Sequence, residues 1–232
     1  MDQRVCVITG ASRGIGLATA LRFARAGYAV VAAARVAPDL LRAAEQIRAL
    51  GAACEPVALD LGVPTTARQL IDAAVARFGR VDVLVNNAAC GPLARIDELD
   101  PATFDQVTAL NIAAVFRITQ AVWPVLKRRQ GGVIVNVSSV ASVDPFPGFA
   151  VYGASKAWMN AFSQAVAAEG APHGIRVFCV APGAVETRML RSSFPNFPSD
   201  QTLAAEEVAS VIYSLCEPTW AHAAGQTIFV RK

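Results

Sequence analysis

The sequence has few of the residues that build disulfide frameworks and metal sites. Its five cysteines stand singly, at Cys6, Cys54, Cys90, Cys179 and Cys216, with no Cys-x-x-Cys motif, and its only histidines are His173 and His222. An odd number of scattered cysteines is typical of a reduced, intracellular chain. Because neither histidine has a ligand partner at a suitable spacing, we expect no metal site.

Long hydrophobic runs and strong charge are also missing. No continuous apolar run approaches the ~18 to 20 residues that span a bilayer, and Met1 lies too close to the apolar stretch 5–9 for a cleavable signal peptide. The net charge is only +3, and the longest basic run, 127–129, precedes Gly131, where cations suit the negative end of a helix. We expect a soluble cytoplasmic protein that binds neither nucleic acid nor membrane.

The fold class follows from short apolar runs that recur along the chain. Hydrophobic residues make up 54% of the sequence, which is ample for a large core. We predict strands at 5–9, 29–34, 56–59, 81–85, 132–138, 175–180 and 227–230, separated by stretches with helical spacing. Apolar strands without alternation are buried on both faces, and a strand, helix, strand succession favours a parallel sheet. The prediction is one doubly wound α/β (Rossmann) domain over 1–232, with about seven parallel strands flanked by helices.

Proline and glycine mark several helix boundaries. Asp100 and Pro101 read as the N-cap and first residue of one helix, and Gly170 with Pro172 should end another. Pro124 falls inside a helical run, where we expect it to kink or divide the helix.

A glycine-rich loop follows the first predicted strand. In "TGASRGIGLATALRF", Gly10, Gly14 and Gly16 come directly before an apolar helix. Glycines permit a tight turn and a close approach of the backbone to a diphosphate, whose charge the helix N-terminus attracts. The Gly-x-x-x-Gly-x-Gly spacing differs from the common Gly-x-Gly-x-x-Gly dinucleotide motif, but the strand before it and the helix after it favour a dinucleotide site.

The end of the second predicted strand bears on the choice of cofactor. About 20 residues beyond a glycine loop, an acid binds the ribose diol of NAD, whereas an arginine accommodates a 2′-phosphate. This sequence has Ala34 followed by Arg35, and Arg13 inside the loop could add a second cation. We therefore expect NADP(H) to be preferred, with NAD(H) possible. The alternative is that both arginines are solvated surface residues.

A second pattern, "YGASK", places Tyr152 and Lys156 four residues apart, on one face of a predicted helix. A nearby ammonium, together with the positive ring of an oxidised nicotinamide, would favour the phenolate of a tyrosine whose pKa is ordinarily near 10. Ser139 ends the strand "GVIVNVSS" at the carboxyl edge of the expected sheet, where open α/β folds bind ligands. A serine hydrolase is disfavoured, because the sequence has no Gly-x-Ser-x-Gly motif.

Taken in order and spacing, these motifs resemble the classical short-chain dehydrogenases/reductases. The resemblance rests on "TGASRGIG", "NNAA" at 86–89, Asn111, Ser139, "YGASK" at 152–156 and "PGAVET" at 182–187, and it extends over nearly the whole chain. It implies a catalytic set of Asn111, Ser139, Tyr152 and Lys156, with Ser138 structural and Asn111 in a water-mediated proton relay with Lys156.

The resemblance also implies a cofactor site. Asp60 would meet the adenine amino group, Asn87 and Ala88 the adenosine ribose, and Thr187 the carboxamide or diphosphate. The implied cofactor-binding residues are Gly10, Ser12, Arg13, Gly14, Ile15, Gly16, Arg35, Asp60, Leu61, Asn87, Ala88, Tyr152, Lys156, Pro182, Gly183, Val185 and Thr187.

The implied function is an NADP(H)-dependent oxidoreductase that acts on a small carbonyl or alcohol substrate. A ketoreductase for 3-oxoacyl thioesters or small to medium ketones is expected, with Tyr152 as acid and base. The alternative is a catalytically silent NADP(H)-binding regulator. Two departures from the family are Ala89 in place of the usual glycine and an ending, "GQTIFVRK", without the glycine-rich tail of many members. A homodimer through the helices bearing Asn111 and Tyr152 is expected, or a homotetramer.

The substrate should be enclosed by the loop 140–151, the segment after Ala89 and a lid at 188–204. Phe146, Phe149, Met189, Phe194 and Phe197 predict an apolar pocket. Arg188 and Arg191 could instead receive an acidic group such as that of a phosphopantetheine.

Overall fold

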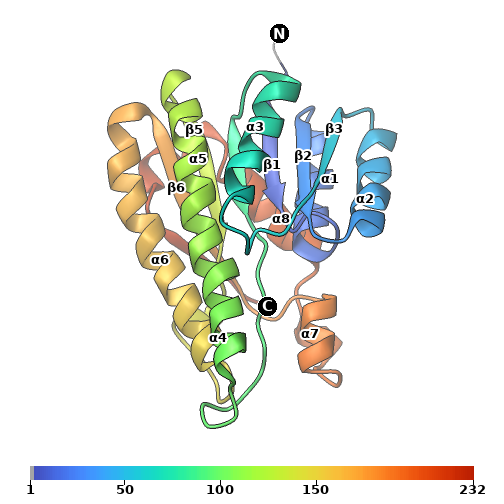
Figure 1. Cartoon of the computed structure of the whole chain (residues 1–232), viewed down its shortest axis with the longest axis vertical. Helices are drawn as coiled ribbons and strands as arrows, with labels where there is room; N and C mark the ends of the chain where they lie inside the picture. Colours follow the sequence, from blue (N-terminus) through green and yellow to red (C-terminus); the bar gives the residue numbers. More distant parts are fainter. Residues whose placement is uncertain (1–2) are drawn as a thin grey trace.

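The computed structural model describes residues 3–232 and is built on one parallel sheet. Its seven strands follow the order β3-β2-β1-β4-β5-β6-β7, and every neighbouring pair is parallel. The strands are β1 Val5–Thr9, β2 Ala29–Ala34, β3 Cys54–Ala58, β4 Val83–Asn86, β5 Gly132–Val137, β6 Ile175–Pro182 and β7 Thr227–Val230. The predicted doubly wound α/β fold is therefore confirmed (Figure 1).

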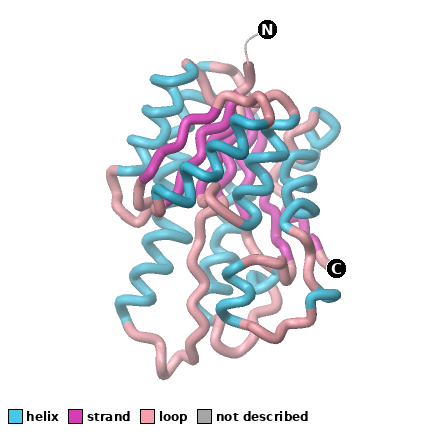
Figure 2. The backbone as a smooth tube through the Cα atoms, turned by 90° about the vertical axis from the view of Figure 1, so that its right-hand side faces the viewer, coloured by secondary structure: helices cyan, strands magenta, loops and turns pink. Residues whose placement is uncertain are grey.

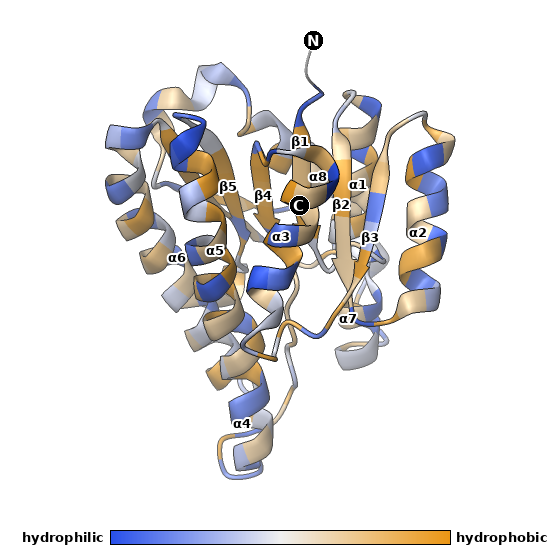
Figure 3. Cartoon of the chain, turned by 45° about the horizontal axis from the view of Figure 1, so that its top comes forward, coloured by the Kyte–Doolittle hydropathy of each residue, from blue (hydrophilic) through white to orange (hydrophobic). Residues whose placement is uncertain are grey.

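Helices cover both faces of this sheet. The long helices are α1 Gly14–Arg25, α2 Ala37–Ala49, α3 Thr66–Phe78, α5 Ala114–Arg128, α6 Ala150–Gly170 and α8 Ala205–Ser214. One hydrophobic cluster joins α1, α2 and α8 to the sheet, and a second joins α3, α5 and α6 to its other face. Figure 3 shows the result, since the strands are hydrophobic along most of their length and the hydrophilic residues gather on the outer helices.

Side-chain alternation explains why the strands are apolar throughout. In β1, Cys6 and Ile8 belong to the first cluster, whereas Val5 and Val7 belong to the second. Successive side chains of a strand point to opposite faces, so a strand covered on both sides must be apolar at every position.

Short helices make up the connections. These are α4 Pro101–Val107, the π-helix η1 Thr108–Ala113, η2 Val140–Ser142, η3 Ala171–His173, α7 Arg188–Ser193, η4 Ser199–Gln201 and η5 Pro218–Ala223. In Figures 1 and 2, α4 and α7 extend beyond the sheet at the end opposite the N-terminus. Both follow the carboxyl ends of strands, the edge at which ligands bind in this architecture.

The predicted helix boundaries are confirmed in two places, and the possible division of a helix at Pro124 is wrong. Asp100 caps α4 by accepting a hydrogen bond from the amide of Thr103 at 2.8 Å, and α6 ends at Gly170. Pro124, by contrast, lies inside α5 and does not divide it. Its ring is exposed on the solvent side, where water can satisfy the carbonyl that loses its partner.

The continuous helical run Pro101–Arg128 also corrects the expectation about membrane-spanning length. By length and composition it could cross a membrane, with a mean hydropathy of 1.4 in its most apolar window, half of which is buried inside the protein. A search for uninterrupted apolar runs does not find this helix, because polar residues interrupt its sequence. Its buried residues, including Ile118 and Val122, pack in the cluster shared with α3 and α6.

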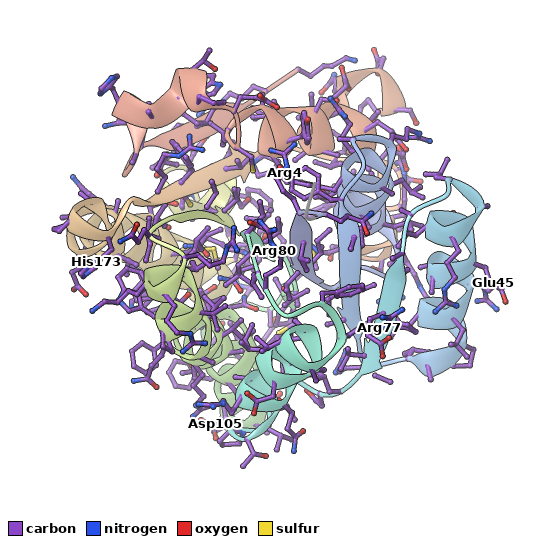
Figure 4. All side chains as sticks on the ribbon, turned by 90° about the horizontal axis from the view of Figure 1, so that it is seen from above. Arg4, Glu45, Arg77, Arg80, Asp105 and His173 are labelled. Carbon is purple, nitrogen blue, oxygen red and sulfur yellow. The ribbon has the colours of Figure 1, made fainter. Side chains whose placement is uncertain are left out.

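The amino ends of the strands are held by polar contacts. Asp82 pairs with Arg80 at 2.7 Å and with Arg129 at 3.1 Å, and accepts a hydrogen bond from the amide of Val5. Figure 4 looks onto this end and shows Arg80 near its centre and His173 at its rim. His173 ends the short helix η3 and lines neither cavity at the opposite end of the sheet.

Candidate active site

Two cavities lie at the carboxyl ends of the strands. The first has a volume of about 820 Å³ and is bounded by the loops after β1, β2, β4 and β5. It is lined by Gly10, Ser12, Arg13, Gly14, Ile15, Ala34, Arg35, Val36, Asp39, Leu59, Leu61, Asn87, Ala88, Ala89, Cys90, Gly91, Pro92, Gln106, Leu110, Val137, Ser138, Tyr152, Lys156, Thr187, Arg188, Met189, Ser192 and Ser193.

The second cavity, of about 490 Å³, is bounded by the segments that the sequence assigned to the substrate. It is lined by Ile15, Gly91, Ser138, Ser139, Val140, Ala141, Phe146, Phe149, Tyr152, Pro182, Gly183, Ala184, Val185, Thr187, Met189, Leu190, Ser193, Phe194 and Phe197.

Tyr152 stands where the two cavities join. It lines both of them, whereas Lys156 lines only the first and Ser139 only the second. One helix and one loop therefore bring these three side chains to the junction, since Tyr152 and Lys156 belong to α6 and Ser139 follows β5.

Lys156 is a buried cation, with only 2% of the residue exposed. Its Nζ donates a hydrogen bond to the main-chain oxygen of Val137 at 2.6 Å and lies 5.7 Å from the centre of the Tyr152 ring. Burial lowers the pKa of Lys156 from 10.5 to about 8, because an ammonium is poorly solvated there. The lysine therefore gains and loses its proton close to the physiological range.

Tyr152 differs from the expectation in its titration. Burial raises the pKa of its phenol, and a hydrogen bond with Ser139 offsets this only in part. The expected lowering of the pKa relied on the charge of Lys156 and of an oxidised nicotinamide, whereas in the protein alone burial is the largest influence and the hydrogen bond with Ser139 is the one that lowers the pKa. With the cofactor's charge set aside, Tyr152 is held in the form that donates a proton.

The two adjacent serines have different surroundings. Ser138 is buried against α6, and its hydroxyl donates a hydrogen bond to the main-chain oxygen of Lys156 at 3.0 Å. Ser139 caps η2, accepting a hydrogen bond from the amide of Ala141 at 3.2 Å, and its hydroxyl faces Tyr152. Ser138 therefore ties strand to helix, while Ser139 is available at the cavity.

Asn111 lies in the π-helix η1 and is fully buried. Its Oδ1 accepts from the amide of Cys90 at 3.0 Å, and its Nδ2 donates to the Cys90 carbonyl at 2.8 Å and to Ser155 Oγ at 3.1 Å. Ser155 in turn donates to the main-chain oxygen of Tyr152. The amide thus connects the loop after β4 to the helix that carries Tyr152, and it makes no direct hydrogen bond to the Lys156 side chain.

The glycine loop fits a diphosphate. Gly10 has a φ of +67°, and a Cβ on Gly16 would lie 2.2 Å from the Gly10 carbonyl oxygen, so the turn closes only without side chains. Arg13 is the N-cap of α1 and makes no side-chain capping bond, and the first turn has no acid. The N-terminal amides of α1 are thereby left for a negatively charged ligand.

Two arginines line the first cavity, Arg13 from the glycine loop and Arg35 from the end of β2. Neither guanidinium group makes a hydrogen bond or ion pair with any residue of the described range 3–232. Asp39 also lines this cavity, but its carboxylate pairs with Arg42. This arrangement leaves two cations free to meet an anionic group.

Several residues of the expected cofactor set lie elsewhere. Asp60 lines neither cavity, because its carboxylate turns back to accept a hydrogen bond from the amide of Gly62 at 2.9 Å. Gly16 is buried beneath the loop. Pro182, Gly183 and Val185 line the second cavity and not the first.

Other residues of the first cavity were not anticipated from the sequence. Gln106 and Leu110 reach it from α4 and η1, and their spacing of four on the helix that bears Asn111 was the available signal. Val36 and Asp39 follow Arg35 closely in the chain, which was a weaker hint. Across the described residues 3–232, no group of three or more His, Cys, Asp or Glu side chains could hold a metal ion, and all five cysteines are free.

A family model described as short chain dehydrogenase matches residues 4–197. The chain belongs to the short-chain dehydrogenase family. A curated member, the 3-oxoacyl-[acyl-carrier-protein] reductase FabG of Thermotoga maritima, is 34% identical, and the alignment covers 98% of this chain and 96% of the relative.

Solved structures of short-chain dehydrogenases show the same fold. The 3-ketoacyl-(acyl-carrier-protein) reductase of Brucella melitensis, complexed with NADH, superposes with a TM-score of 0.91 at 31% identity, covering 98% of this chain and 96% of that one. The L-sorbose reductase of Gluconobacter frateurii, complexed with NADPH and L-sorbose, has a TM-score of 0.92 at 28% identity, covering 100% and 97%. As a member of this family, the protein is an NAD(P)-dependent oxidoreductase. This favours catalysis over the alternative of a silent cofactor-binding regulator.

Proposed function

We propose that this short-chain dehydrogenase is an NADP(H)-dependent ketoreductase in which Tyr152 exchanges a proton with the substrate oxygen. The observation that carries the proposal is the position of Tyr152 between the two cavities, with Lys156 reaching only the first and Ser139 only the second. A dinucleotide fits the first cavity, where the glycine turn, the free helix N-terminus and Lys156 are found. The substrate then belongs in the second.

When bound, the nicotinamide cofactor supplies or accepts the hydride. The protein handles the proton and the oxygen. In reduction, the Tyr152 phenol donates its proton to the carbonyl oxygen, which becomes the alcohol, and Ser139 donates a hydrogen bond to the same oxygen and polarises it. The positive charge of Lys156, buried one helical turn away, stabilises the phenolate that remains. Asn111 positions α6 and the Cys90 loop around this group.

The proposed preference for NADP(H) rests on two positive charges in the lining of the first cavity. Arg13 and Arg35 are free to bind the 2′-phosphate, and a planar guanidinium suits phosphate oxygens. The carboxylate of Asp39, which lines the same cavity, pairs with Arg42. NAD(H) remains the weaker cofactor in this proposal, in keeping with an NADH complex and an NADPH complex among the structural relatives.

We also propose that the enzyme is a cytoplasmic homodimer or homotetramer whose subunits meet through α5 and α6. These helices expose an aromatic face on which Phe116 packs edge-on against Phe162, and Trp158 stacks on Phe162 at 4.6 Å. Phe116 is 46% exposed in the single chain. An aromatic patch of this kind is typical of a contact with another chain. The segment 188–204 acts as a lid over the substrate.

The substitution Tyr152→Phe tests the proposed chemistry. It removes the proton donor but keeps the ring that packs on Phe149 at 5.0 Å. We expect NADPH affinity, measured by fluorescence titration, to change by less than about twofold, while kcat for ketone reduction falls by about 10³-fold or more. Turnover close to that of the parent enzyme would refute the role of Tyr152. If the parent enzyme binds NADPH but turns over no carbonyl, the result would favour a catalytically silent NADP(H)-binding regulator.

A further inference from the structure

The second cavity has no charged lining. All of its lining residues lie in the described part of the chain, and none is Asp, Glu, Lys, Arg or His. Its hydroxyls are concentrated where it meets the first cavity, at Ser138, Tyr152, Thr187 and Ser193, with Ser139 beside them. Beyond that junction every lining side chain is apolar. An ionised group placed against this apolar lining would lose part of its hydration without gaining a partner from the lining.

Aromatic rings line the part of the cavity that lies away from the junction. Phe194 of the lid meets Phe146 at 5.5 Å and Phe149 at 5.9 Å between ring centres, in edge-to-face geometry. Phe149 in turn lies 5.0 Å from Tyr152. A flat or cyclic apolar body placed here contacts ring faces and edges while its carbonyl reaches the phenol of Tyr152, a geometry that aromatic side chains favour.

Arg191 does not supply the missing charge, because its guanidinium is committed to the lid itself. It pairs with Glu186 through two nitrogens, one of them at 2.7 Å. It also donates to the main-chain oxygens of Pro195 at 3.2 Å and Phe197 at 2.6 Å, and to Ser199 Oγ at 2.9 Å. An exposed ion pair alone contributes little, so the bonds to the two loop carbonyls are what make this residue a brace.

The two ends of the lid are joined next to Glu186, the residue with which Arg191 pairs. Val185 and Leu203 form a parallel bridge, in which Leu203 donates to the Ala184 carbonyl at 2.8 Å and accepts from the amide of Glu186 at 2.9 Å. Arg191 therefore lies inside a closed loop and holds the turn that presents Phe194 and Phe197 to the cavity. The other arginine of the lid, Arg188, lines the first cavity and not the second.

We propose that the substrate is an uncharged ketone with an aryl or alicyclic body, and that Arg191 is a positioning residue that shapes this cavity by bracing the lid. The proposal rests on the ketoreductase function argued above and narrows it. It disfavours substrates whose body places an acidic group in the apolar part of this cavity, away from the carbonyl, and it removes Arg191 from the residues available to a phosphopantetheine.

A matched substrate panel tests the class. Acetophenone, 4-acetylbenzoate, 2-octanone and acetoacetyl-coenzyme A are compared by NADPH oxidation, and the binding of each is measured separately by thermal shift in the presence of NADP⁺. We expect kcat/KM for acetophenone to exceed that for 4-acetylbenzoate by on the order of 100-fold, because the cavity leaves a carboxylate unpaired. Equal or better use of 4-acetylbenzoate or acetoacetyl-coenzyme A overturns the proposal, and a tenfold preference for 2-octanone overturns its cyclic part.

The binding arm separates this proposal from the ketoreductase function. Acetophenone that binds with NADP⁺ but is not reduced overturns the proposed reaction and supports the cavity's ligand class. If acetophenone neither binds nor reacts while a charged carbonyl does either, the ligand class is wrong. If no member of the panel binds or reacts, the proposed ligand class is also overturned. The ketoreductase function is then tested separately, by NADPH binding and by the Tyr152→Phe comparison.

Arg191→Met tests the brace. We expect KM for acetophenone to rise about tenfold with kcat within about threefold, KM for NADPH unchanged, and no selective loss of 4-acetylbenzoate. Arg191→Lys, which keeps the charge but not the planar fork, should give an intermediate KM. Arg128→Met, at the exposed end of α5, controls for the loss of an arginine. A selective loss of activity on 4-acetylbenzoate in Arg191→Met would show that Arg191 binds acidic substrates. Unchanged KM values for acetophenone in Arg191→Met and Arg191→Lys would show that Arg191 does not position the lid.

Discussion

The ammonium of Lys156 lies 5.7 Å from the centre of the Tyr152 ring and donates to the carbonyl of Val137, with almost no contact with solvent. A buried lysine whose ammonium makes a single hydrogen bond is costly for the folded protein alone, because its other two N–H groups have no acceptor among residues 3–232. This cation lines the first cavity beside the phenol. If Lys156 has the role proposed above, the protein gives up stability at this position in exchange for catalysis.

Lys156→Met should therefore stabilise the enzyme in the absence of cofactor. The folded pKa of about 8 is below the unfolded value of 10.5, so the folded state binds fewer protons between these values, and stability rises with pH across this window. The destabilisation by Lys156 is complete below pH ~8, at up to about 3 kcal/mol, and fades towards pH ~10.5. Urea denaturation of both proteins from pH 6.5 to 10 measures the difference.

Lys127→Met, at the exposed end of α5, provides the control for this comparison and should change stability by less than about 0.5 kcal/mol at any pH. A gain in Lys156→Met that is constant from pH 7 to 10 would show that the lysine is not the group whose titration matters. A loss of stability at pH 7 would show that its hydrogen bond to Val137 outweighs its desolvation.

The adjacent serines should separate catalysis from stability. Ser139→Ala removes the hydroxyl that meets Tyr152 and one capping bond of η2, so we expect kcat to fall by about 10²-fold or more at a cost of about 1 kcal/mol in stability. Ser138→Ala leaves the Lys156 carbonyl without its hydroxyl donor and should cost about 1 to 2 kcal/mol, with a smaller fall in kcat. Steady-state kinetics and thermal unfolding of both variants check the contrast. The reverse order of the two effects on kcat would assign the cavity hydroxyl to Ser138.

The strands most easily predicted from sequence are those formed by an unbroken run of apolar or β-branched residues. The predicted bounds of β1 and β2 match the structure because each is an unbroken apolar run of β-branched residues or alanine. The prediction for β3 began two residues late and ended one residue late, because Glu55 and Pro56 interrupt its apolar run. The other edge strand, β7, is also only partly buried, and its predicted bounds match because it is an unbroken run of β-branched and aromatic residues.

The site shows a similar division between local and distant relationships. Tyr152 and Lys156 were predictable as neighbours because one helical turn separates them. The contacts of Asn111 with Cys90 and of Arg191 with Phe197 were not predictable, because each depends on the path of a loop rather than on spacing along one element. The same reason explains Asp60, whose carboxylate turns back onto Gly62 instead of facing the first cavity.

Arg35→Asp should reverse the preference for NADP(H). The substitution replaces a free guanidinium at the end of β2 with a carboxylate, which repels a 2′-phosphate and can accept hydrogen bonds from a ribose diol. We expect kcat/KM for NADPH to fall by about 100-fold and that for NADH to change little or rise, because a charge-assisted contact is lost and a like charge is introduced. Initial rates with both cofactors give the ratio.

Arg13→Gln tests the second guanidinium in the same assay. It removes one of the two cations without introducing a negative charge, so its effect on NADPH should be smaller, about tenfold, and raised salt should weaken NADPH binding to the parent more than to this variant. Arg68→Asp, on the exposed face of α3 where Arg68 pairs with Asp72, has the same charge change as Arg35→Asp and should leave both cofactors unaffected. If Arg35→Asp and Arg68→Asp behave alike, the arginine at the end of β2 is a solvated surface residue, and the cofactor preference has to be sought among other residues of the first cavity.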